Sequence, residues 1–147
     1  GFVKKENKSI KFLGIDYKSM HIDNDIVLDL PFEIGKTDLE DVQINIALLN
    51  LPGNKIIRLQ SNLKNESIFF NHDHKYLVRF LVKSPNLAPG KYFLEIYMRN
   101  NDNVLFWTQN LPAFEIKQSA RKEHNKLYYD QIGYIMPHFS LSCRKID

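Results

Sequence analysis

Most of the chain alternates apolar and polar residues with a period of two, the pattern of strands that bury one face. The run 26–34 shows it most clearly, and Pro31 indicates an edge or bulged position there, because proline has no N–H to donate to the ladder. Further runs of this kind cover residues 42–49, 55–58, 76–82, 92–99, 104–107 and 113–116. Turn residues separate these runs at roughly 8 to 12 residue intervals. The pattern therefore predicts an all-β sandwich, with a barrel as the alternative.

The turn residues also predict which runs pair. Pro52, Gly53 and Asn54 favour a turn that joins 42–49 to 55–58 as a hairpin. The sequence Ala88-Pro89-Gly90 precedes 92–99, and we expect that strand to form a second hairpin-like pair with 76–82.

The two ends of the chain lack this regularity. Residues 1–8 are expected to be a flexible start, and the charged stretch Ser119–Lys126 has no apolar face, so 119–131 is interpreted as an exposed connector, with a short helix as the alternative. Residues 132–143 regain strand character, with either Ile132, Tyr134 and Met136 or the opposite set, including Phe139 and Leu141, facing a core. This strand could fold back or pair with another subunit.

Composition narrows the class of protein. The 147 residues are 44% hydrophobic and 12% aromatic, too apolar for a disordered chain, so we expect one folded domain over 1–147. Its 20 Lys and Arg are interleaved with 17 Asp and Glu, which disfavours nucleic-acid binding. No membrane-spanning window or secretory signal is visible. The single cysteine, Cys143, excludes an internal disulfide and fits a reducing compartment.

Candidate catalytic and metal-binding groups are weak. His72 and His74 in the sequence His-Asp-His would share one face of an extended segment, but further ligands are missing, so a solvated turn is favoured over a metal site. Paired acids such as Asp23 and Asp25 lie in polar turns, where nothing would raise a pKa. Cys143 lacks a local nucleophile signature. We expect no catalytic site, no metal and no cofactor.

Several segments, in order, resemble one family. They are Asn86–Ile96, Ala47–Ile56 followed by Ser61-Asn62, Pro112–Ile116, and Gly133–Phe139, in which Phe139 stands where the family pattern has Trp. Together they resemble the C-terminal carbohydrate-binding domain of Wzt, the nucleotide-binding subunit of ABC transporters that export O-antigen polysaccharides.

The resemblance spans roughly residues 10–141 and has several implications. It implies an antiparallel sandwich of immunoglobulin-like topology that binds the O-antigen polysaccharide without catalysing a reaction, and a homodimer that exchanges its C-terminal strands. It also implies a cytoplasmic protein, held at the inner face of the bacterial inner membrane by a transmembrane exporter subunit. No Gly-x-x-x-x-Gly-Lys-[ST] loop occurs in the sequence, so the ATPase domain is expected upstream in a longer polypeptide.

Sugar recognition needs aromatic faces together with amide, carboxylate or guanidinium groups. If Tyr92 faces the core, Glu95, Tyr97 and Arg99 share the opposite face of their strand, and Gln43 and Asn45 share that face of theirs. Arg79 adds a hydrogen-bond donor. Trp107 is a further candidate, although a single Trp near a strand end more often fills a core or edge position than binds a sugar. The predicted carbohydrate-binding residues are Tyr97, Arg99, Glu95, Gln43, Asn45, Arg79 and Trp107. An ordinary solvated sheet face is the competing interpretation.

A second function class stays open. Leu77, Leu81 and Phe93 occupy positions predicted to face outward, and a contiguous apolar face would favour a structural or protein-interaction sandwich that binds no glycan.

Overall fold

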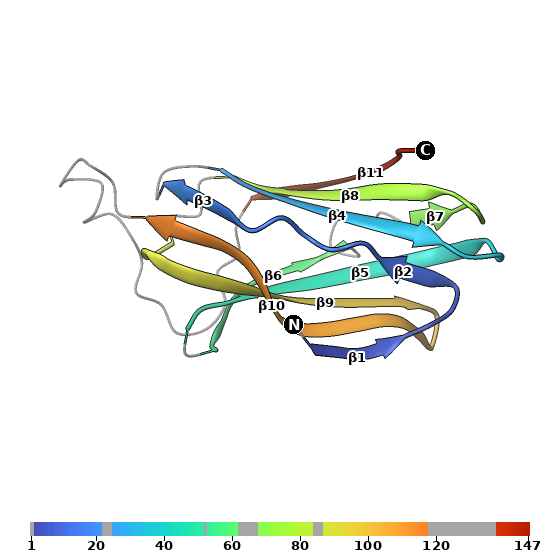
Figure 1. Ribbon diagram of the computed structural model, residues 1–147, viewed down its shortest axis with the longest axis horizontal. Coiled ribbons are helices and arrows are strands. Elements are labelled where there is room, and N and C mark those ends of the chain that lie inside the picture. The colour runs from blue at the N-terminus through green and yellow to red at the C-terminus, as the bar shows by residue number, and fades with distance from the viewer. Residues whose placement is uncertain (1, 22–24, 52, 62–67, 84–86, 118–137) are drawn as a thin grey trace.

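The computed structural model describes residues 2–21, 25–51, 53–61, 68–83, 87–117 and 138–147, which fold as two facing sheets (Figure 1). Sheet A has the order β1 (Phe2–Glu6), β10 (Asn103–Lys117), β9 (Gly90–Asn100), β5 (Leu39–Leu49) and β6 (Lys55–Gln60). In addition, β3 (Lys18–His21) pairs with β10 and β7 (Ile68–Phe70) pairs with β5. Sheet B has the order β11 (Phe139–Lys145), β8 (Lys75–Val82), β4 (Ile26–Ile34) and β2 (Ile10–Phe12).

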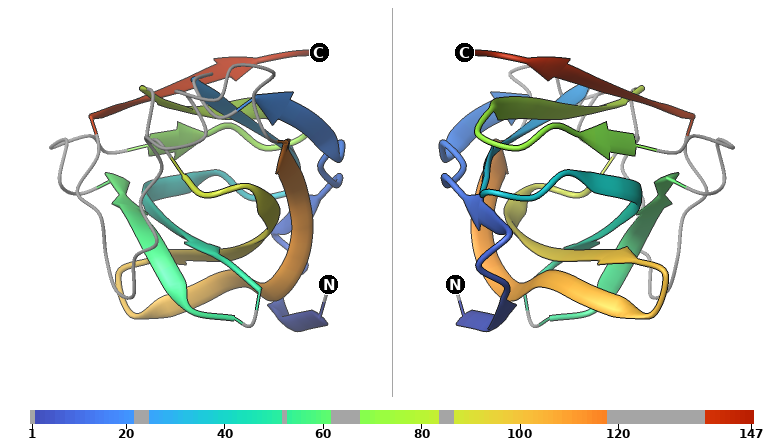
Figure 2. Two further views of the ribbon diagram at one scale, coloured as in Figure 1. Left: turned by 90° about the vertical axis from the view of Figure 1, so that its left-hand side faces the viewer. Right: turned by 90° about the vertical axis from the view of Figure 1, so that its right-hand side faces the viewer.

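The sandwich predicted from the alternating pattern is confirmed. Every paired neighbour in the two sheets is antiparallel except β3, which runs parallel to β10. Figure 2 shows that sheet A curls, so that β6 and the end of β10 rise on opposite sides of the core while sheet B covers it. In the described part of the chain, no helix has the length and apolar character that crossing a membrane would require.

The predicted hairpin between β5 and β6 is also confirmed. The Asn50 amide donates to the Asn54 carbonyl, and the Asn54 amide donates to Asn50 Oδ1 at 2.9 Å, which closes the turn. Gly53 has a φ of +112°, a conformation that side chains disfavour and glycine adopts freely. The hairpin matters for the site because it carries Lys55 and Arg58 to the edge of sheet A.

The expected pairing of β8 with β9 is wrong. β8 pairs with β4 and β11 in sheet B, whereas β9 pairs with β5 and β10 in sheet A, so the chain crosses the sandwich between them. Leu87, in the crossing, is buried in the core. An alternating pattern shows which residues face inward but not which sheet a strand joins.

Two strands expected at 104–107 and 113–116 form one long strand, β10. Shifts in its register against β9 absorb the polar stretch between them, where Asn110 adopts a φ of +56°. Pro112 is tolerated within β10 because it lies between the two strands that pair with the outer edge of β10. The pairing with β1 ends at Gln109 and the pairing with β3 begins at Phe114, so among the described strands none pairs with that edge at Pro112. Pro31 on β4 has a similar position. The pairing of β4 with β2 ends at Phe32, and Pro31 lies one residue beyond it.

The two ends differ from the sequence expectation in different ways. Phe2–Glu6, expected to be a flexible start, forms β1 on the edge of sheet A. The connector 119–131 and residues 132–137 lie outside the described residues. β11 runs from Phe139 to Lys145 and pairs antiparallel with β8 of the same chain. Leu141 is buried and Phe139 packs against the core. Exchange of this strand between subunits stays a prediction, because the structure contains one chain.

The core consists of the inward residues of both sheets. Phe12 from β2, Phe32 from β4 and Phe106 from β10 lie with ring centroids 5.3 to 6.2 Å apart and join the two layers. Tyr92 and Phe80, both predicted to be core residues, are buried. Ser61 is fully buried, and its hydroxyl accepts a hydrogen bond from the Ile44 amide at 2.9 Å, which ties the end of β6 to β5.

Candidate functional site

The outer face of sheet A contains a hollow of about 380 Å³. It spans four neighbouring strands, β10, β9, β5 and β6. Its lining residues are Asn45, Ile46, Ala47, Lys55, Arg58, Glu95, Tyr97, Arg99, Trp107 and Gln109. We refer to it as the sheet A hollow.

Strand register explains why residues distant in sequence meet there. Tyr97 on β9 lies between Asn45 on β5 and Trp107 on β10. Two residues along β9, Arg99 lies opposite Gln43. Alternation within each strand places these side chains on the same face. The structure thus brings together six of the predicted residues: Gln43, Asn45, Glu95, Tyr97, Arg99 and Trp107.

Glu95 organises one end of the hollow. Its carboxylate accepts hydrogen bonds from Gln109 Nε2 at 2.6 Å and from Trp107 Nε1 at 3.4 Å, and it forms an ion pair with Lys55 Nζ at 3.0 Å. The Glu95 side chain is 14% exposed. Burial alone would raise its pKa, but the contacts with Gln109, Lys55 and Trp107 outweigh burial and lower the pKa below its ordinary value. The carboxylate is therefore ionised at neutral pH.

An aromatic pair forms one wall. The rings of Tyr97 and Trp107 lie edge to face, with centroids 5.9 Å apart and an interplanar angle of 79°. Both residues are half-buried on the outer face. Trp107 is consequently not a core filler, and its indole N–H donates to Glu95 within the hollow. Such rings offer apolar faces that suit the C–H patches of a sugar.

Basic side chains line another part of the hollow, and the residue that forms its floor has a small side chain. Arg99 Nε donates to Gln43 Oε1 at 3.1 Å, which orients the guanidinium. Ala47 lies between Glu95 on β9 and Arg58 on β6, so a methyl group forms the floor between a carboxylate and a second guanidinium. Asn45 Oδ1 is buried without a hydrogen-bond partner among the described residues.

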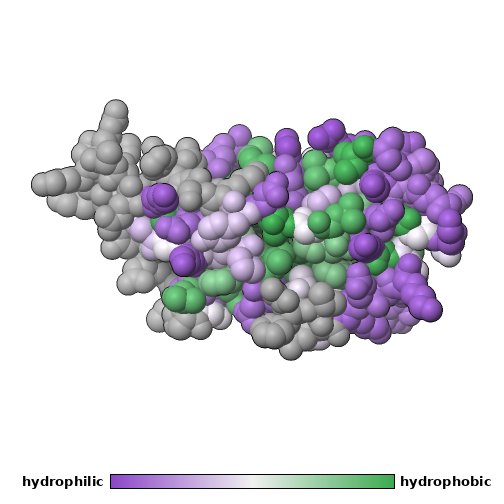
Figure 3. Space-filling view, in the orientation of Figure 1, coloured by the Kyte–Doolittle hydropathy of each residue, from purple (hydrophilic) through white to green (hydrophobic). Residues whose placement is uncertain are grey.

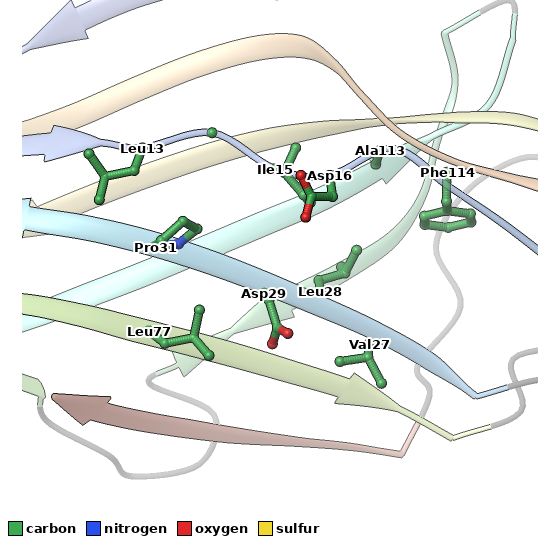
Figure 4. Close-up of a pocket in the computed structure, with 11 residues that line it drawn as sticks. Leu13, Ile15, Asp16, Val27, Leu28, Asp29, Pro31, Leu77, Ala113 and Phe114 are labelled. Atoms are coloured by element: carbon green, nitrogen blue, oxygen red, sulfur yellow. The ribbon is translucent and has the colours of Figure 1, made fainter. Parts of the chain in front are cut away.

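Arg79 lies elsewhere. It projects from β8 on sheet B, where its guanidinium forms two hydrogen bonds with Asp29 at 2.7 and 3.0 Å, and this pairing raises its pKa. Asp29 lines a second hollow of about 410 Å³, with the apolar side chains of Leu13, Pro31 and Leu77 (Figure 4). The structure therefore does not bring Arg79 together with the other six residues.

Sequence reasoning missed three polar residues of the site, Lys55, Arg58 and Gln109, and the small residue Ala47 that forms its floor. Gln109 follows Trp107 by two positions on a strand and so shares its face, a signal that was available in the sequence. Arg58 lies between buried Ile57 and Leu59, which also marks it as an outward residue. Their proximity to Glu95 depends on the order of strands in sheet A, which the pattern does not encode.

The remaining candidates from the sequence are the His-Asp-His segment and Cys143. His72 and Asp73 form the turn expected from the sequence. His72 Nδ1 lies 2.6 Å from Asp38 Oδ1, and this hydrogen bond raises the pKa of His72. His74 Nδ1 lies 3.2 Å from the Asp147 carboxylate. No group of three His, Cys, Asp or Glu that could hold a metal occurs in the described ranges. Desolvation raises the pKa of Cys143 to about 11, so it is a thiol at neutral pH.

Comparison with known proteins identifies the family. The crystal structure of the C-terminal domain of Wzt has a similar fold, with a TM-score of 0.62 at 12% sequence identity over 78% of this chain and 77% of that chain. No curated protein sequence matches the chain. The family described as the Wzt C-terminal domain matches residues 23–127, more than half of the chain. The chain therefore belongs to the Wzt C-terminal domain family.

Proposed function

We propose that this domain is a non-catalytic carbohydrate-binding module that recognises the O-antigen polysaccharide substrate of an ABC exporter, and that the sheet A hollow binds the glycan. The observation that carries the proposal is the convergence there of an aromatic pair, an ionised carboxylate, two guanidiniums and amides from four strands. Family membership supports the same conclusion.

The arrangement suits a sugar in three respects. The ring faces of Tyr97 and Trp107 cover apolar C–H patches, and this contact requires no hydrogen-bond geometry. The Glu95 carboxylate accepts hydrogen bonds from hydroxyls, and Arg99 donates to them. The residues lie on paired strands, so the site is largely preformed and little ordering is required on binding. An open face of this size is expected to bind a few sugar residues with micromolar to millimolar affinity, roughly 4 to 8 kcal/mol.

The proposed cellular setting follows from the family. The ATPase domain would lie in another part of a longer polypeptide, and the polypeptide would contact the transmembrane exporter subunit at the cytoplasmic face of the bacterial inner membrane. The domain would form a homodimer by exchange of the C-terminal strand, which brings two hollows to one polysaccharide and increases its apparent affinity.

Calorimetric titration with the cognate O-polysaccharide, and in parallel with a mismatched one, tests the function. We expect the cognate polymer to bind and the variant Ala47→Leu, which fills the floor of the hollow, to lose that binding. Tyr17→Ala serves as the control, because Tyr17 is an exposed aromatic residue that does not line the hollow. Equal or absent binding of the two polymers would contradict the proposal.

A second candidate function, protein interaction, is favoured by the apolar residues on sheet B. Val27 lies opposite Leu81, and Pro31 lies opposite Leu77, on either side of the Asp29–Arg79 ion pair. Leu13 beside them is 41% exposed. Figure 3, which views the side of the sandwich where β2 and β3 lie, shows apolar side chains gathered near the middle with hydrophilic side chains around them. Crosslinking to exporter components that does not change when polysaccharide is added would support this role.

A further inference from the structure

Phe93 is an outward aromatic residue that does not line the sheet A hollow. Alternation along β9 places it on the same outer face as Glu95 and Tyr97. It is half-buried, and among the described residues it neither belongs to the core nor packs against it. Leu77 and Leu81, the other outward apolar residues expected from the sequence, lie on sheet B. Phe93 is therefore separate from the apolar residues of sheet B.

Two apolar residues lie beside Phe93 on the same sheet. Its register partners are Leu49 on β5 and Pro112 on β10. Leu49 is half-buried, Pro112 is exposed, and among the described residues neither packs against the core. We refer to Leu49, Phe93 and Pro112 as the Phe93 shelf. Their side chains carry no hydrogen-bonding group, so the shelf can contact the C–H face of a sugar ring but cannot bind its hydroxyls.

The Phe93 shelf borders the sheet A hollow. Lys55 lies opposite Leu49 in the register of β5 and β6, and its Nζ reaches Glu95 at 3.0 Å. Lys55 and Glu95 both line the hollow. The ion pair thus forms the boundary between the two surfaces, and a ligand that extends past Glu95 along β9 reaches the shelf on the same face of the sheet.

The distance between the two aromatic positions on β9 sets the size of such a ligand. The pairing of β9 with β5 is regular from Tyr97, opposite Asn45, to Phe93, opposite Leu49. At about 3.3 Å per residue, the strand from Tyr97 to Phe93 spans roughly 13 Å. Each sugar residue lengthens a polysaccharide by less than half of this distance. One sugar therefore cannot contact both rings, whereas a chain of three or more can.

We propose that the Phe93 shelf is a second sugar-binding subsite, and that the domain recognises a stretch of at least three sugar residues instead of a single sugar. This inference rests on the proposed function, because it extends the same site. Glu95 and the aromatic pair of Tyr97 and Trp107 bind the hydroxyls and ring of one sugar, and the shelf contacts the apolar face of another sugar further along the chain.

The dependence of affinity on glycan length tests the shelf. Calorimetric titration of the 147-residue chain uses a disaccharide and a hexasaccharide fragment of the cognate O-polysaccharide. We expect the hexasaccharide to bind roughly tenfold more tightly, because only the longer fragment covers both Tyr97 and the shelf. Trp107 is the single tryptophan of the sequence and lines the hollow, so a change in its fluorescence with either fragment reports occupation of the hollow.

Variants assign the length dependence to Phe93. Phe93→Ala should lower the affinity for the hexasaccharide to that for the disaccharide, whereas Phe93→Tyr keeps the ring and should retain the preference for the longer fragment. Tyr97→Ala should weaken binding of both fragments. Phe69→Ala is the matched control, because Phe69 is 47% exposed on β7 and lies outside the hollow and the shelf, and it should change neither affinity. Thermal unfolding of each variant confirms that it folds.

The second subsite is overturned if the two fragments bind equally tightly, or if Phe93→Ala and Phe69→Ala behave alike. Either result leaves the proposed function standing where the cognate polysaccharide still binds and Ala47→Leu still abolishes that binding. If neither the fragments nor the whole polysaccharide binds, the proposed function fails and the subsite fails with it.

Discussion

Gln43 and Arg99 lie opposite each other on β5 and β9, and the Arg99 guanidinium donates to the Gln43 side-chain carbonyl at 3.1 Å. This hydrogen bond joins two neighbouring strands through residues that are 56 positions apart in the sequence. It fixes a cationic side chain that is otherwise long and free to rotate. Ordering Arg99 before the ligand arrives lowers the entropy cost of binding.

The first prediction concerns this pair. Gln43→Ala should weaken glycan binding although Gln43 does not line the hollow itself, because Arg99 would then have to be ordered on binding. Gln43→Glu should also weaken binding, because the new carboxylate would pair with the Arg99 guanidinium and engage the N–H groups that it offers to the ligand. Calorimetric titration with the cognate O-polysaccharide measures both effects. Wild-type affinity of both variants would show that Gln43 does not position Arg99.

The second prediction separates binding from stability on the outer face. Tyr97→Ala and Arg99→Ala should each weaken glycan binding by about 1 to 2 kcal/mol while the melting temperature stays nearly unchanged, because their outward side chains are not packed in the core. Titration and thermal unfolding of the same samples give the two quantities. A large fall in melting temperature would show that these residues stabilise the fold instead.

The third prediction concerns a core residue, for which we expect a substitution to lower the stability of the fold. Phe80 on β8 is fully buried, and its ring stacks on Phe139 of β11 at 6.3 Å. Phe80→Ala should lower the free energy of unfolding by about 3 to 5 kcal/mol through lost burial and the cavity left behind. Urea unfolding measures this value. A soluble variant of wild-type stability would contradict the packing described for β8 and β11.

The fourth prediction concerns the pH dependence of Glu95. Its contacts hold the folded-state pKa below the ordinary value of 4.5, so they stabilise the fold above about pH 4.5. This stabilisation decreases as the pH falls and is lost once the pH passes the lowered pKa. Glu95→Gln should therefore be less stable than wild type at pH 7, with the difference shrinking towards pH 3.

Urea unfolding at several pH values checks the fourth prediction. Glu33→Gln provides a control, since the exposed Glu33 side chain lies on β4 of sheet B and away from the hollow. A stability difference between Glu95→Gln and wild type that stays constant from pH 7 to pH 3 would contradict the assigned role.

The sequence predicted the strands better than it predicted their neighbours. Inward residues such as Ile44, Ile96 and Phe80 follow from period two, because burial of one face imposes it. The same period placed Gln43 and Glu95 on outward faces correctly. The period does not specify strand order, which is why β8 was paired with β9 and why Arg79 was grouped with residues on the opposite sheet. Lys55 was missed for that reason too, since its ion pair with Glu95 needs β6 and β9 on either side of β5.

The last prediction is a two-fold dimer in which β11 of each chain pairs with β8 of the other. Within one chain, Cys143 on β11 lies opposite Val78 on β8, and Cys143 is the single cysteine of the sequence. Val78→Cys therefore creates a pair that a disulfide can join across two antiparallel strands.

After mild oxidation, exchanged strands would give a covalent dimer on a non-reducing gel, whereas strands paired within one chain would give a crosslinked monomer. Val78→Cys combined with Cys143→Ser is the matched control and should give neither product. Deletion of residues from Ser119 onward should leave a monomer of lower stability, because the edge of β8 then loses its partner. Exchange is ruled out if the disulfide forms within one chain and light scattering shows a monomer at tens of micromolar, since strands that complete a neighbour's sheet require two chains.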